Sequence, residues 1–358
     1  RQDEIRIANT PASFEPTLDY IVTKVARFPF DKFSDASNKL GTQMKATGEV
    51  MSIGRTMEES LLKAVRSLET GVCHIYHKKF DKWSNDDLLA YIKGGTDDRL
   101  YAIGQLIRNG VDLALIYDKT KIDMFFLEKF KNIVEFENVV RAHPMDVETL
   151  RAAKRMGFSD KYIGQLWGLS QNEMYRLREK NNVFPVYKMI DTCASEFASY
   201  VPYFYSTYEE ENESIVSGKE KIIVLGSGPI RIGQGVEFDY STVHAIWSIR
   251  AAGYEAIIIN NNPETVSTDY TTSDKLYFEP LTVEDVMNVI HLEKPKAIVV
   301  SLGGQTAINL AEPLAELGVP IIGTDTQAIK NAEDRGCFER IMEAVSYTHL
   351  RAHETRED

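Results

Sequence analysis

The final third of the chain alternates short apolar runs with amphipathic stretches. The apolar runs have the length of buried strands and cover 221–225, 255–259, 275–279, 297–302 and 319–323. The stretches between them have the spacing of helices and cover 241–253, 283–291 and 307–317. Regular alternation of this kind predicts a parallel, doubly wound sheet with a Rossmann-like arrangement.

The middle of the chain has helix periodicity instead. Asp97 and Asp146 stand at predicted helix starts, and Gly110 and Gly157 stand where a left-handed C-cap residue is favoured. Another helix pattern covers 122–138. The stretch 183–212 is aromatic and interrupted by prolines, so we expect it to be an extended connector lying across other domains.

Three regions and a tail follow from these patterns. Residues 1–68 are mixed, with a strand pattern at IVTKV and a helix pattern over 58–68. Residues 69–213 form a predicted helical domain, and 214–344 form a predicted α/β domain. The tail 345–358, VSYTHLRAHETRED, has no periodicity and resembles a translated sequencing adapter. We expect this tail to be non-native and leave it out of the fold prediction.

Composition and charge place the chain among soluble globular proteins. Of its 358 residues, 43% are hydrophobic and 26% are charged, which is typical of a packed core rather than of disorder. Lys+Arg number 41 and Asp+Glu 53, a formal net charge of −12, so the overall field does not favour a nucleic-acid backbone or an anionic membrane. No apolar stretch approaches the roughly 18 residues of a spanning helix. We therefore expect neither nucleic acid nor a membrane as a partner.

Cysteine content and the start of the chain bear on location. Cys73, Cys193 and Cys337 are too few for a disulfide framework in a chain of this length, which favours a reducing compartment. The chain begins with Arg1 rather than Met, and no leader pattern follows it. We expect a cytoplasmic location and a chain that is part of something longer.

Three polar, glycine-containing loops follow three of the predicted strands. They cover 226–240, 260–270 and 303–306, and ligands collect at the carboxyl ends of parallel strands in such sheets. Glycine permits close backbone approach and helix N-termini attract anions, so the third loop is a candidate anion-binding loop. Its residues are Gly303, Gly304, Gln305 and Thr306. A tight strand-to-helix turn that needs the two glycines is the alternative.

The first loop does not have a nucleotide-binding fingerprint. Gly226, Gly228 and Gly233 give the spacing G-x-G-x-x-x-x-G rather than G-x-G-x-x-G. The second predicted strand is followed by Asn260, where NAD binding requires an acidic residue, and no Gly-Lys-Ser/Thr follows the loop. Nicotinamide-dependent dehydrogenases are therefore disfavoured, and the loop is not a P-loop.

Two loop carboxylates are candidate site residues. Glu237 follows Gly235 at a helix start, where its structural alternative is a first-turn carboxylate facing the helix dipole. Glu264 lies among polar neighbours at the carboxyl end of a strand, where the alternative is a solvated loop carboxylate.

Two further groupings carry weaker indications of function. The run CHIYH at 73–77 supplies metal-ligand types, but no second cluster completes a tetrahedral zinc site, and no catalytic triad is defined in the chain. Residues 159–182 look like a helix-turn-helix, with Gly168 near the turn and Ser170 as a cap of the second helix. From 151 to 182 there are seven Lys+Arg and three Asp+Glu. The alternative function is therefore a non-catalytic assembly or nucleic-acid-binding protein.

The three loops and several flanking segments resemble one known family. GSGPIRIGQGVEFDY, NNNPETVSTDYTTSDKLYFEPLT and SLGGQT, in this order, resemble the large chain of carbamoyl-phosphate synthetase. TPASFEPTLDYIVTKV, QMKATGEVMSIGRTMEESLLKAVRSLE, FPVYKMIDTCASEFAS and YSTYEEEN are similar to the same family. The resemblance covers nearly everything from Thr10 to Ala344.

The resemblance implies a fragment that spans the junction between the two similar halves of that large chain. Residues 1–68 would be the C-terminal end of the first, carboxyphosphate-forming ATP-grasp half. Residues 69–213 would be the helical oligomerisation domain, which then contains the segment that looks like a helix-turn-helix. Residues 214–344 would be the pre-ATP-grasp α/β domain that opens the second, carbamoyl-phosphate-forming half.

The resemblance also implies the reaction of the parent enzyme. The family is an ATP-dependent ligase that makes carbamoyl phosphate from bicarbonate, ammonia and two ATP, with Mg²⁺ or Mn²⁺, for arginine and pyrimidine biosynthesis. A glutamine amidotransferase small chain supplies the ammonia, and the helical domain self-associates. The ATP and metal ligands of the family lie outside this chain. We therefore assign no catalytic, ATP-binding or metal-binding residue and expect the fragment itself to be inactive.

Four residues match the lining of the family's carbamate passage. Glu49 in TGEVMSIG and Glu264 in NPET look like two of its glutamates. Gly235 matches a glycine whose small size keeps the passage open, and Glu237 lies beside it. The resemblance implies that these carboxylates form a polar wall and are not chemical catalysts.

Overall fold

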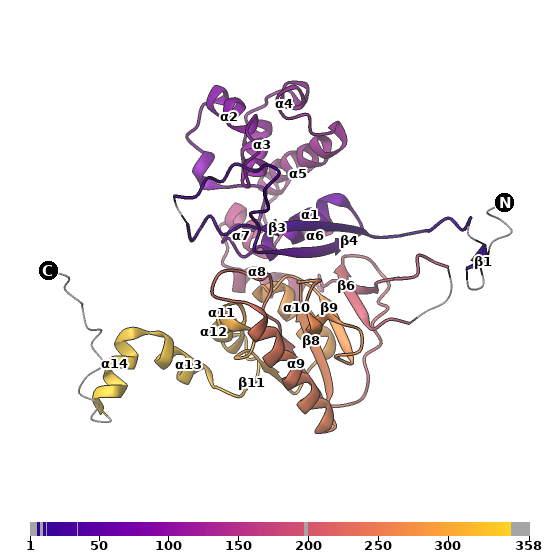
Figure 1. The fold of residues 1–358 in the computed structure, drawn as a ribbon, viewed down its shortest axis with the longest axis vertical. Helices are drawn as coiled ribbons and strands as arrows, with labels where there is room; N and C mark the ends of the chain where they lie inside the picture. Colours follow the sequence, from indigo (N-terminus) through magenta and orange to yellow (C-terminus); the bar gives the residue numbers. More distant parts are fainter. Residues whose placement is uncertain (1–5, 8–9, 12, 34, 197–199, 345–358) are drawn as a thin grey trace.

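The computed structural model describes residues 6–7, 10–11, 13–33, 35–196 and 200–344 (Figure 1). The tail 345–358, predicted to be non-native, lies outside the described residues. From top to bottom, Figure 1 shows a group of helices, a hairpin with helices beside it, and a sheet. Helices α13 (Thr326–Glu333) and α14 (Arg335–Ala344) extend away from the sheet at the lower left.

A seven-stranded sheet forms the lower part of the molecule, in the order β11-β10-β7-β8-β9-β6-β5. In chain order its strands are β5 (Val186–Met189), β6 (Tyr203–Thr207), β7 (Lys221–Leu225), β8 (Glu255–Asn260), β9 (Lys275–Phe278), β10 (Ala297–Val299) and β11 (Ile321–Ile322). Neighbouring strands are parallel except β5 and β6, which are antiparallel. The predicted parallel sheet is confirmed.

Helices cover both faces of the sheet because apolar residues continue through β7 and β8. Ile223 and Leu225 pack on one face with α10 (Val283–Glu293), α11 (Gly304–Ile308) and α12 (Ala311–Glu316). Val224 packs on the other face with α9 (Val236–Ala251). The short turn η3 (Val266–Thr268) follows β8. Uninterrupted apolar strands are typical of parallel sheets that are buried on both faces.

The stretch 183–212, expected to be a connector, contributes β5 and β6 to one edge of the sheet. Its aromatic residues are core residues: Tyr187, Phe204 and Tyr205 are buried, and the rings of Tyr187 and Tyr277 meet edge-on with centroids 4.8 Å apart. The prolines of this stretch stand just before the strands, where they cost no ladder hydrogen bond. The sheet therefore begins before residue 214, the predicted start of the α/β domain.

The helix predicted over 307–317 is two short helices, α11 and α12, separated at 309–310. Pro313 explains the break, because it has no backbone N–H and its ring clashes with the carbonyl four residues earlier. Pro313 lies instead in the first turn of α12, where the backbone N–H is not needed.

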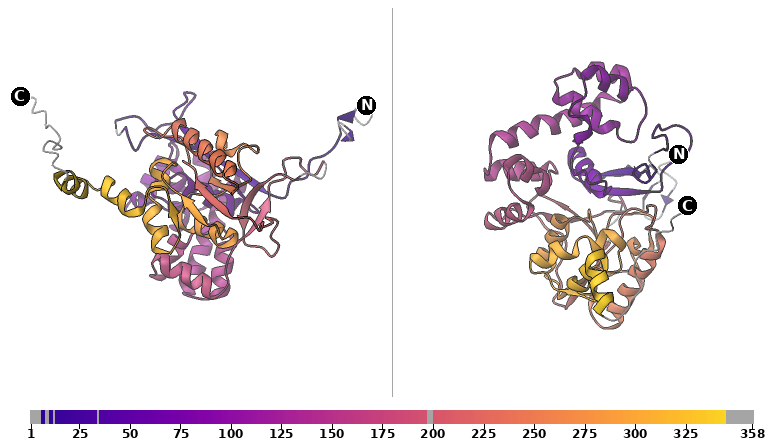
Figure 2. Two further views of the ribbon diagram at one scale, coloured as in Figure 1. Left: turned by 90° about the horizontal axis from the view of Figure 1, so that it is seen from below. Right: turned by 90° about the vertical axis from the view of Figure 1, so that its left-hand side faces the viewer.

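The helical region contains α2 (Asn85–Ile92), α3 (Arg99–Arg108), α4 (Leu113–Thr120), α5 (Met124–Ala142), α6 (Val147–Arg155), α7 (Asp160–Trp167) and α8 (Gln171–Lys180), with the short turn η2 (Lys78–Phe80). In the right-hand view of Figure 2, α7 and α8 lie along one side, between the upper helices and the sheet. Helices α7 and α8 are therefore the part of the helical region that lies next to the sheet (Figure 2).

Most of the predicted helix caps are present. The Asp146 carboxylate accepts a first-turn backbone N–H at 2.8 Å, and Gly110 and Gly157 have φ of 79° and 91°. Asp97 does not begin a helix, because α3 starts after Asp98. The Asp98 side chain makes no cap bond and instead accepts hydrogen bonds from a lysine and a tyrosine at 2.7 and 2.6 Å.

A hairpin lies between the helical region and the sheet. It consists of β3 (Ile21–Arg27) and β4 (Gly48–Gly54), followed by α1 (Met57–Ser67). The Met51 N–H donates to the Asn261 carbonyl at 3.0 Å, and the Thr47 hydroxyl donates to the Ile230 carbonyl at 3.2 Å. The hairpin therefore rests on the loops that follow β7 and β8. Farther out, β1 (Arg6–Ile7) pairs with β2 (Thr10–Pro11).

No helix in the described ranges is both long enough and apolar enough to cross a bilayer.

Candidate functional site

The three polar loops gather at the edge where the parallel strands end, called here the carboxyl edge. The Gly226 N–H donates to the Ile259 carbonyl at 2.9 Å, and the Gly228 N–H donates to Asn260 Oδ1 at 3.1 Å. A Cβ atom at Gly303 would lie 2.4 Å from the Gly226 carbonyl oxygen. The loops after β7, β8 and β10 are therefore in direct contact, as parallel strand ends require.

Glu49 reaches this edge from the hairpin. It is half-buried on β4, and its Oε1 forms an ion pair with Lys24 Nζ at 2.5 Å. The hydrogen bond to Glu49 raises the pKa of Lys24, and the negative charge of Glu264 adds to this rise. Two of the predicted passage glutamates, from different parts of the chain, thus both raise the pKa of Lys24.

Glu264 is exposed beside a hollow of about 320 Å³. The hollow lies between α9 and the loop after β8, and Val236, Tyr240 and Trp247 of α9 line its other side. Val236 follows Gly235, so the start of α9 and Glu264 border the same space. Gly235 and Glu264 thus lie in loops of the carboxyl edge, and Glu49 lies on the hairpin that contacts these loops.

Gly235 and Glu237 form the start of α9. The Gly235 N–H donates to Glu237 Oε1 at 3.1 Å, and backbone hydrogen bonds lower the pKa of the exposed Glu237. Glu237 therefore makes the contacts of a first-turn carboxylate at the start of α9. A Cβ atom at Gly235 would lie 2.8 Å from Glu237 Oε2 and would meet no other part of the chain as closely.

The candidate anion-binding loop is filled by groups of the chain itself. A Cβ atom at Gly304 would lie 2.9 Å from the Gln234 side chain, and Gln305 is exposed and bonds to Asn309 at 2.9 Å. The Thr306 hydroxyl donates to the Glu69 carboxylate at 2.7 Å. Burial raises the pKa of Glu69 to about 7, while Thr306 and nearby arginines act in the opposite direction. Sequence reasoning missed Glu69, because nothing in its position after a helix indicates this partner.

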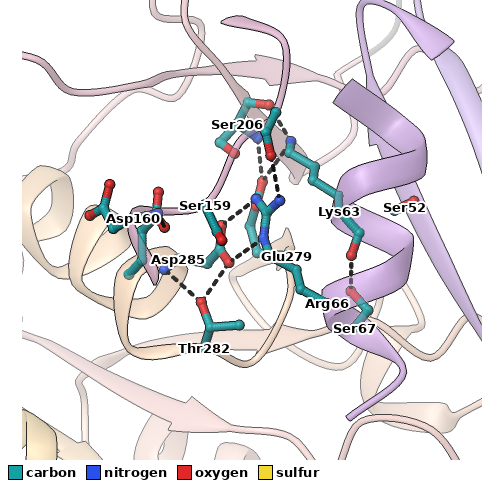
Figure 3. Close-up of polar contacts among 12 residues, drawn as sticks. Ser52, Lys63, Arg66, Ser67, Ser159, Asp160, Ser206, Glu279, Thr282 and Asp285 are labelled. Carbon is teal, nitrogen blue, oxygen red and sulfur yellow. Dashed lines mark hydrogen bonds and ion pairs between the residues drawn. The ribbon is translucent and has the colours of Figure 1, made fainter. Parts of the chain in front are cut away.

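A second group of polar residues, absent from the sequence prediction, lies where α1, the helical region and α10 meet (Figure 3). We call it the junction cluster. It consists of Glu59, Lys63, Arg66, Lys154, Asp160, Arg178, Glu279, Glu284 and Asp285, all of which are buried. Arg66 and Asp285 form two hydrogen bonds of 3.0 Å, and Lys63 Nζ donates to the Ile53 carbonyl at 3.0 Å.

Lys154 and Arg178 connect the helical region to α10 within this cluster. Lys154 Nζ forms ion pairs with Asp160 at 3.1 Å and with Glu284. Arg178 forms an ion pair with Asp160 at 2.8 Å and donates to Asn288 at 3.0 Å. Burial alone would raise the pKa of Glu284, but Lys154 and Arg178 lower it to about 2. The ion pair of Lys154 with Glu284 and the hydrogen bond of Arg178 to Asn288 therefore join the helical region to α10.

This geometry bears on the helix-turn-helix alternative. Helix α8 has the predicted N-cap at Ser170, and Gly168, predicted near the turn, has φ of 73°. The structure adds Ser159 as the N-cap of α7. Lys154 and Arg178 are 2% and 0% exposed, so these two basic residues face the protein interior. They are not available to the phosphates of a nucleic acid, whereas Arg155, Lys161, Arg176 and Lys180 of the same stretch are exposed.

The CHIYH run has a structural explanation as well. His74 is buried, bonds to Glu137 at 3.0 Å and stacks on Tyr162, while His77 accepts the Lys79 N–H at 3.0 Å. Across the described residues, no group of three or more His, Cys, Asp or Glu side chains could hold a metal ion. The described residues thus do not fit a metal, and we derive no step through one.

The paired Glu137 carboxylate is expected to make an acid-sensitive contribution to the free energy of unfolding. Burial would raise its pKa, but hydrogen bonds from His74 and Arg108 lower it from 4.5 to about 2. The stabilisation is therefore present above about pH 4.5 and is lost as the pH falls toward 2. We expect Glu137→Gln to lower the free energy of unfolding at pH 7 by up to about 3 kcal/mol, with a smaller difference at pH 3 in urea titrations.

A control for this prediction lies on the same helix. Glu135 is 63% exposed and 3.5 Å from Lys131, so Glu135→Gln should change stability by less than about 0.5 kcal/mol at either pH. Equal effects of the two replacements would contradict the assignment to Glu137.

Two protein-family models match parts of this chain. Residues 49–182 match the family described as carbamoyl-phosphate synthetase large chain, oligomerisation domain. Residues 218–331 match the family described as carbamoyl phosphate synthase preATP-grasp domain. A solved structure of Rhizobium etli pyruvate carboxylase T882A with the allosteric activator acetyl coenzyme-A is similar at 12% identity, with a TM-score of 0.27, over 36% of this chain and 12% of that chain. On the strength of the two domain matches, the chain belongs to the carbamoyl-phosphate synthetase large-chain family.

Proposed function

We propose that the chain is the central part of the large subunit of a carbamoyl-phosphate synthase, an ATP-dependent ligase. The observation that carries this proposal is that two domain families of one large chain match the helical region and the sheet of one structure. The junction cluster supports it, because the buried Lys154–Glu284 ion pair and the hydrogen bond from Arg178 to Asn288 join these two regions. The chain would thus hold together the two phosphorylating halves of the enzyme.

The parent enzyme would make carbamoyl phosphate from bicarbonate, ammonia and two ATP, for arginine and pyrimidine biosynthesis in the cytoplasm. A glutamine amidotransferase small chain would supply ammonia, and the helical region would mediate self-association. ATP and Mg²⁺ or Mn²⁺ would be bound by parts of the large chain outside this sequence, where the metal would neutralise charge on the phosphates. The role of this chain would be to position the two halves of the enzyme and to enclose the intermediates that pass between them.

Enclosure would be the task of the carboxyl edge. Carbamate and carboxyphosphate hydrolyse in water, so they must travel within protein. Glu49, Gly235, Glu237 and Glu264 would form part of the wall of the passage between the halves. Their shared location supports this role: Glu49 and Glu264 both act on Lys24, and Glu264 borders the hollow at the start of α9.

An ATP hydrolysis assay of the purified 358-residue chain tests whether the phosphorylating sites lie outside it. We expect no bicarbonate-dependent ATP hydrolysis above background, because the described residues offer no metal site. Saturable, bicarbonate-dependent hydrolysis would show that the chain contains a phosphorylating site and would contradict the proposal.

A graft tests the positive part of the proposal. Residues 13–344 would replace the matching segment of a complete large chain of this family, assayed with its small chain. We expect glutamine-dependent carbamoyl phosphate synthesis to be retained. A graft that folds and binds the small chain but carries out neither partial ATP reaction would contradict the proposed function.

A further inference from the structure

Glu69 has an unusual backbone conformation and an unusual environment. It directly follows α1 and its cap, and its φ is 56°, a left-handed value that costs energy for any residue with a side chain. Its side chain is only 13% exposed. A strained backbone persists only where surrounding contacts hold it, so the contacts of this carboxylate need an explanation.

The Glu69 carboxylate lies in a polar site formed by the loop after β7, which contains Arg231, and the loop after β10, which contains Thr306. Glu69 Oε2 accepts hydrogen bonds from Arg231 Nη1 at 2.9 Å and from the Thr306 hydroxyl at 2.7 Å. Arg231 Nη2 also donates to Gln234 Oε1 at 3.1 Å and to Thr306 Oγ1 at 3.2 Å. Gln234 Nε2 donates to Thr306 Oγ1 at 2.8 Å and to the Ser227 carbonyl. Every donor in this set is oriented by another member.

The loop after β7 is shaped around this carboxylate. A Cβ atom at Gly228 would lie 2.5 Å from Glu69 Oε1, and Gly228 has φ of 68°. The backbones of Arg231 and Gln234 pair with each other at 3.1 and 2.9 Å, which fixes the turn that carries both side chains. Gln234 and Thr306 are 4% and 5% exposed, so the site is built into the interior.

We propose that Arg231, Gln234 and Thr306 form an internal carboxylate site whose resident ligand is Glu69, and that Glu69 is thereby a positioning residue for the loop that ends at Gly235. The site joins α1 to the loops 226–235 and 303–306. Its consequence for a carbamate passage rests on the proposed function, whereas the carboxylate site itself does not.

Removal of the resident ligand tests the site in the 358-residue chain at pH 8, where the Glu69 carboxylate is charged. Glu69→Gly removes the carboxylate and tolerates the left-handed backbone; Glu69→Ala is the second variant. We expect amide exchange over 226–235 and 303–306 to rise by roughly tenfold to a hundredfold, the size of a lost charge-assisted hydrogen bond. Sodium formate, a small carboxylate that fits the vacated space, should reverse most of this rise with saturation.

Two controls separate a specific site from a general effect of salt. Glu69→Gly combined with Arg231→Met should show the same rise but no response to formate, because the cation that binds the carboxylate is gone. Glu312→Ala removes a carboxylate from an exposed ion pair, 2.9 Å from Lys330, and should not respond to formate. Sodium chloride at equal ionic strength should reproduce none of the reversal.

The outcomes distinguish the two proposals. If formate has no effect on either Glu69 variant, or acts equally without Arg231, the internal carboxylate site is wrong. If formate protects the loops but Glu69→Gln in the grafted synthase leaves carbamoyl phosphate synthesis unchanged, the site stands and its link to the passage fails. We expect synthesis to fall by roughly tenfold in that variant, with both partial ATP reactions retained and with Glu69→Asp restoring part of the loss.

Discussion

Lys154→Met is expected to lower the free energy of unfolding by about 3–5 kcal/mol, the cost of breaking a buried ion pair. Lys154 is 2% exposed and neutralises two carboxylates, Asp160 at 3.1 Å and Glu284. Without it, Glu284 remains buried with its charge uncompensated on this side. Urea unfolding of the 358-residue chain at pH 7, followed by circular dichroism, measures the change.

Two further replacements show whether the charge is responsible. Lys154→Met combined with Glu284→Gln should recover part of the loss, because Asp160 keeps Arg178 as a partner at 2.8 Å. Lys131→Met removes an exposed lysine that lies 3.5 Å from Glu135 and should cost less than about 0.5 kcal/mol. A loss below about 1 kcal/mol for Lys154→Met would mean that the junction cluster does not hold the two regions together.

Gly235→Phe, in a synthase that carries residues 13–344, is expected to reduce carbamoyl phosphate synthesis by roughly tenfold or more, because an intermediate that cannot pass is hydrolysed. The backbone tolerates the change: Gly235 has φ of −103°, and its Cβ would meet only the flexible end of Glu237 at 2.8 Å. The protein should therefore fold, and the phenyl ring should occupy the carboxyl edge between the start of α9 and its neighbouring loops.

The partial reactions provide the decisive comparison. Bicarbonate-dependent ATP hydrolysis and ATP formation from carbamoyl phosphate should each change by less than about twofold, since neither requires transfer between the halves. Gly218→Phe is the matched control, because a Cβ atom there would have no neighbour within 4 Å. If synthesis and both partial reactions fell together in Gly235→Phe, the passage assignment would be wrong.

The local pattern of the sequence was sufficient for most of the elements. The strand predicted over 221–225 is β7 itself, and that over 255–259 differs from β8 by one residue. Both are continuous apolar runs bounded by polar loops, so their burial does not depend on which partner covers them. The cap at Ser170 and the turn at Gly168 also follow from local chemistry.

Elements that depend on distant partners were harder to predict. The sequences of β5 and β6 show no clear alternation of apolar and polar residues. Their aromatic residues are buried only because they pack into a sheet formed largely by later strands. Asp98 stands at a helix start, but its carboxylate bonds to Lys79 and Tyr91 rather than to the helix backbone. In both cases a tertiary contact outweighed the local preference.

The candidate site shows the same division. The sequence by itself determined that the loops after β7, β8 and β10 share one edge, since parallel strands end on the same side. Only the tertiary structure decided that Lys24 faces Glu49, that Glu69 fills the site at Thr306, and that Lys154 and Arg178 are buried. A charged side chain has the same local pattern whether it is solvated or paired inside the protein. Its role depends on which remote segment brings the opposite charge, and that is settled by packing.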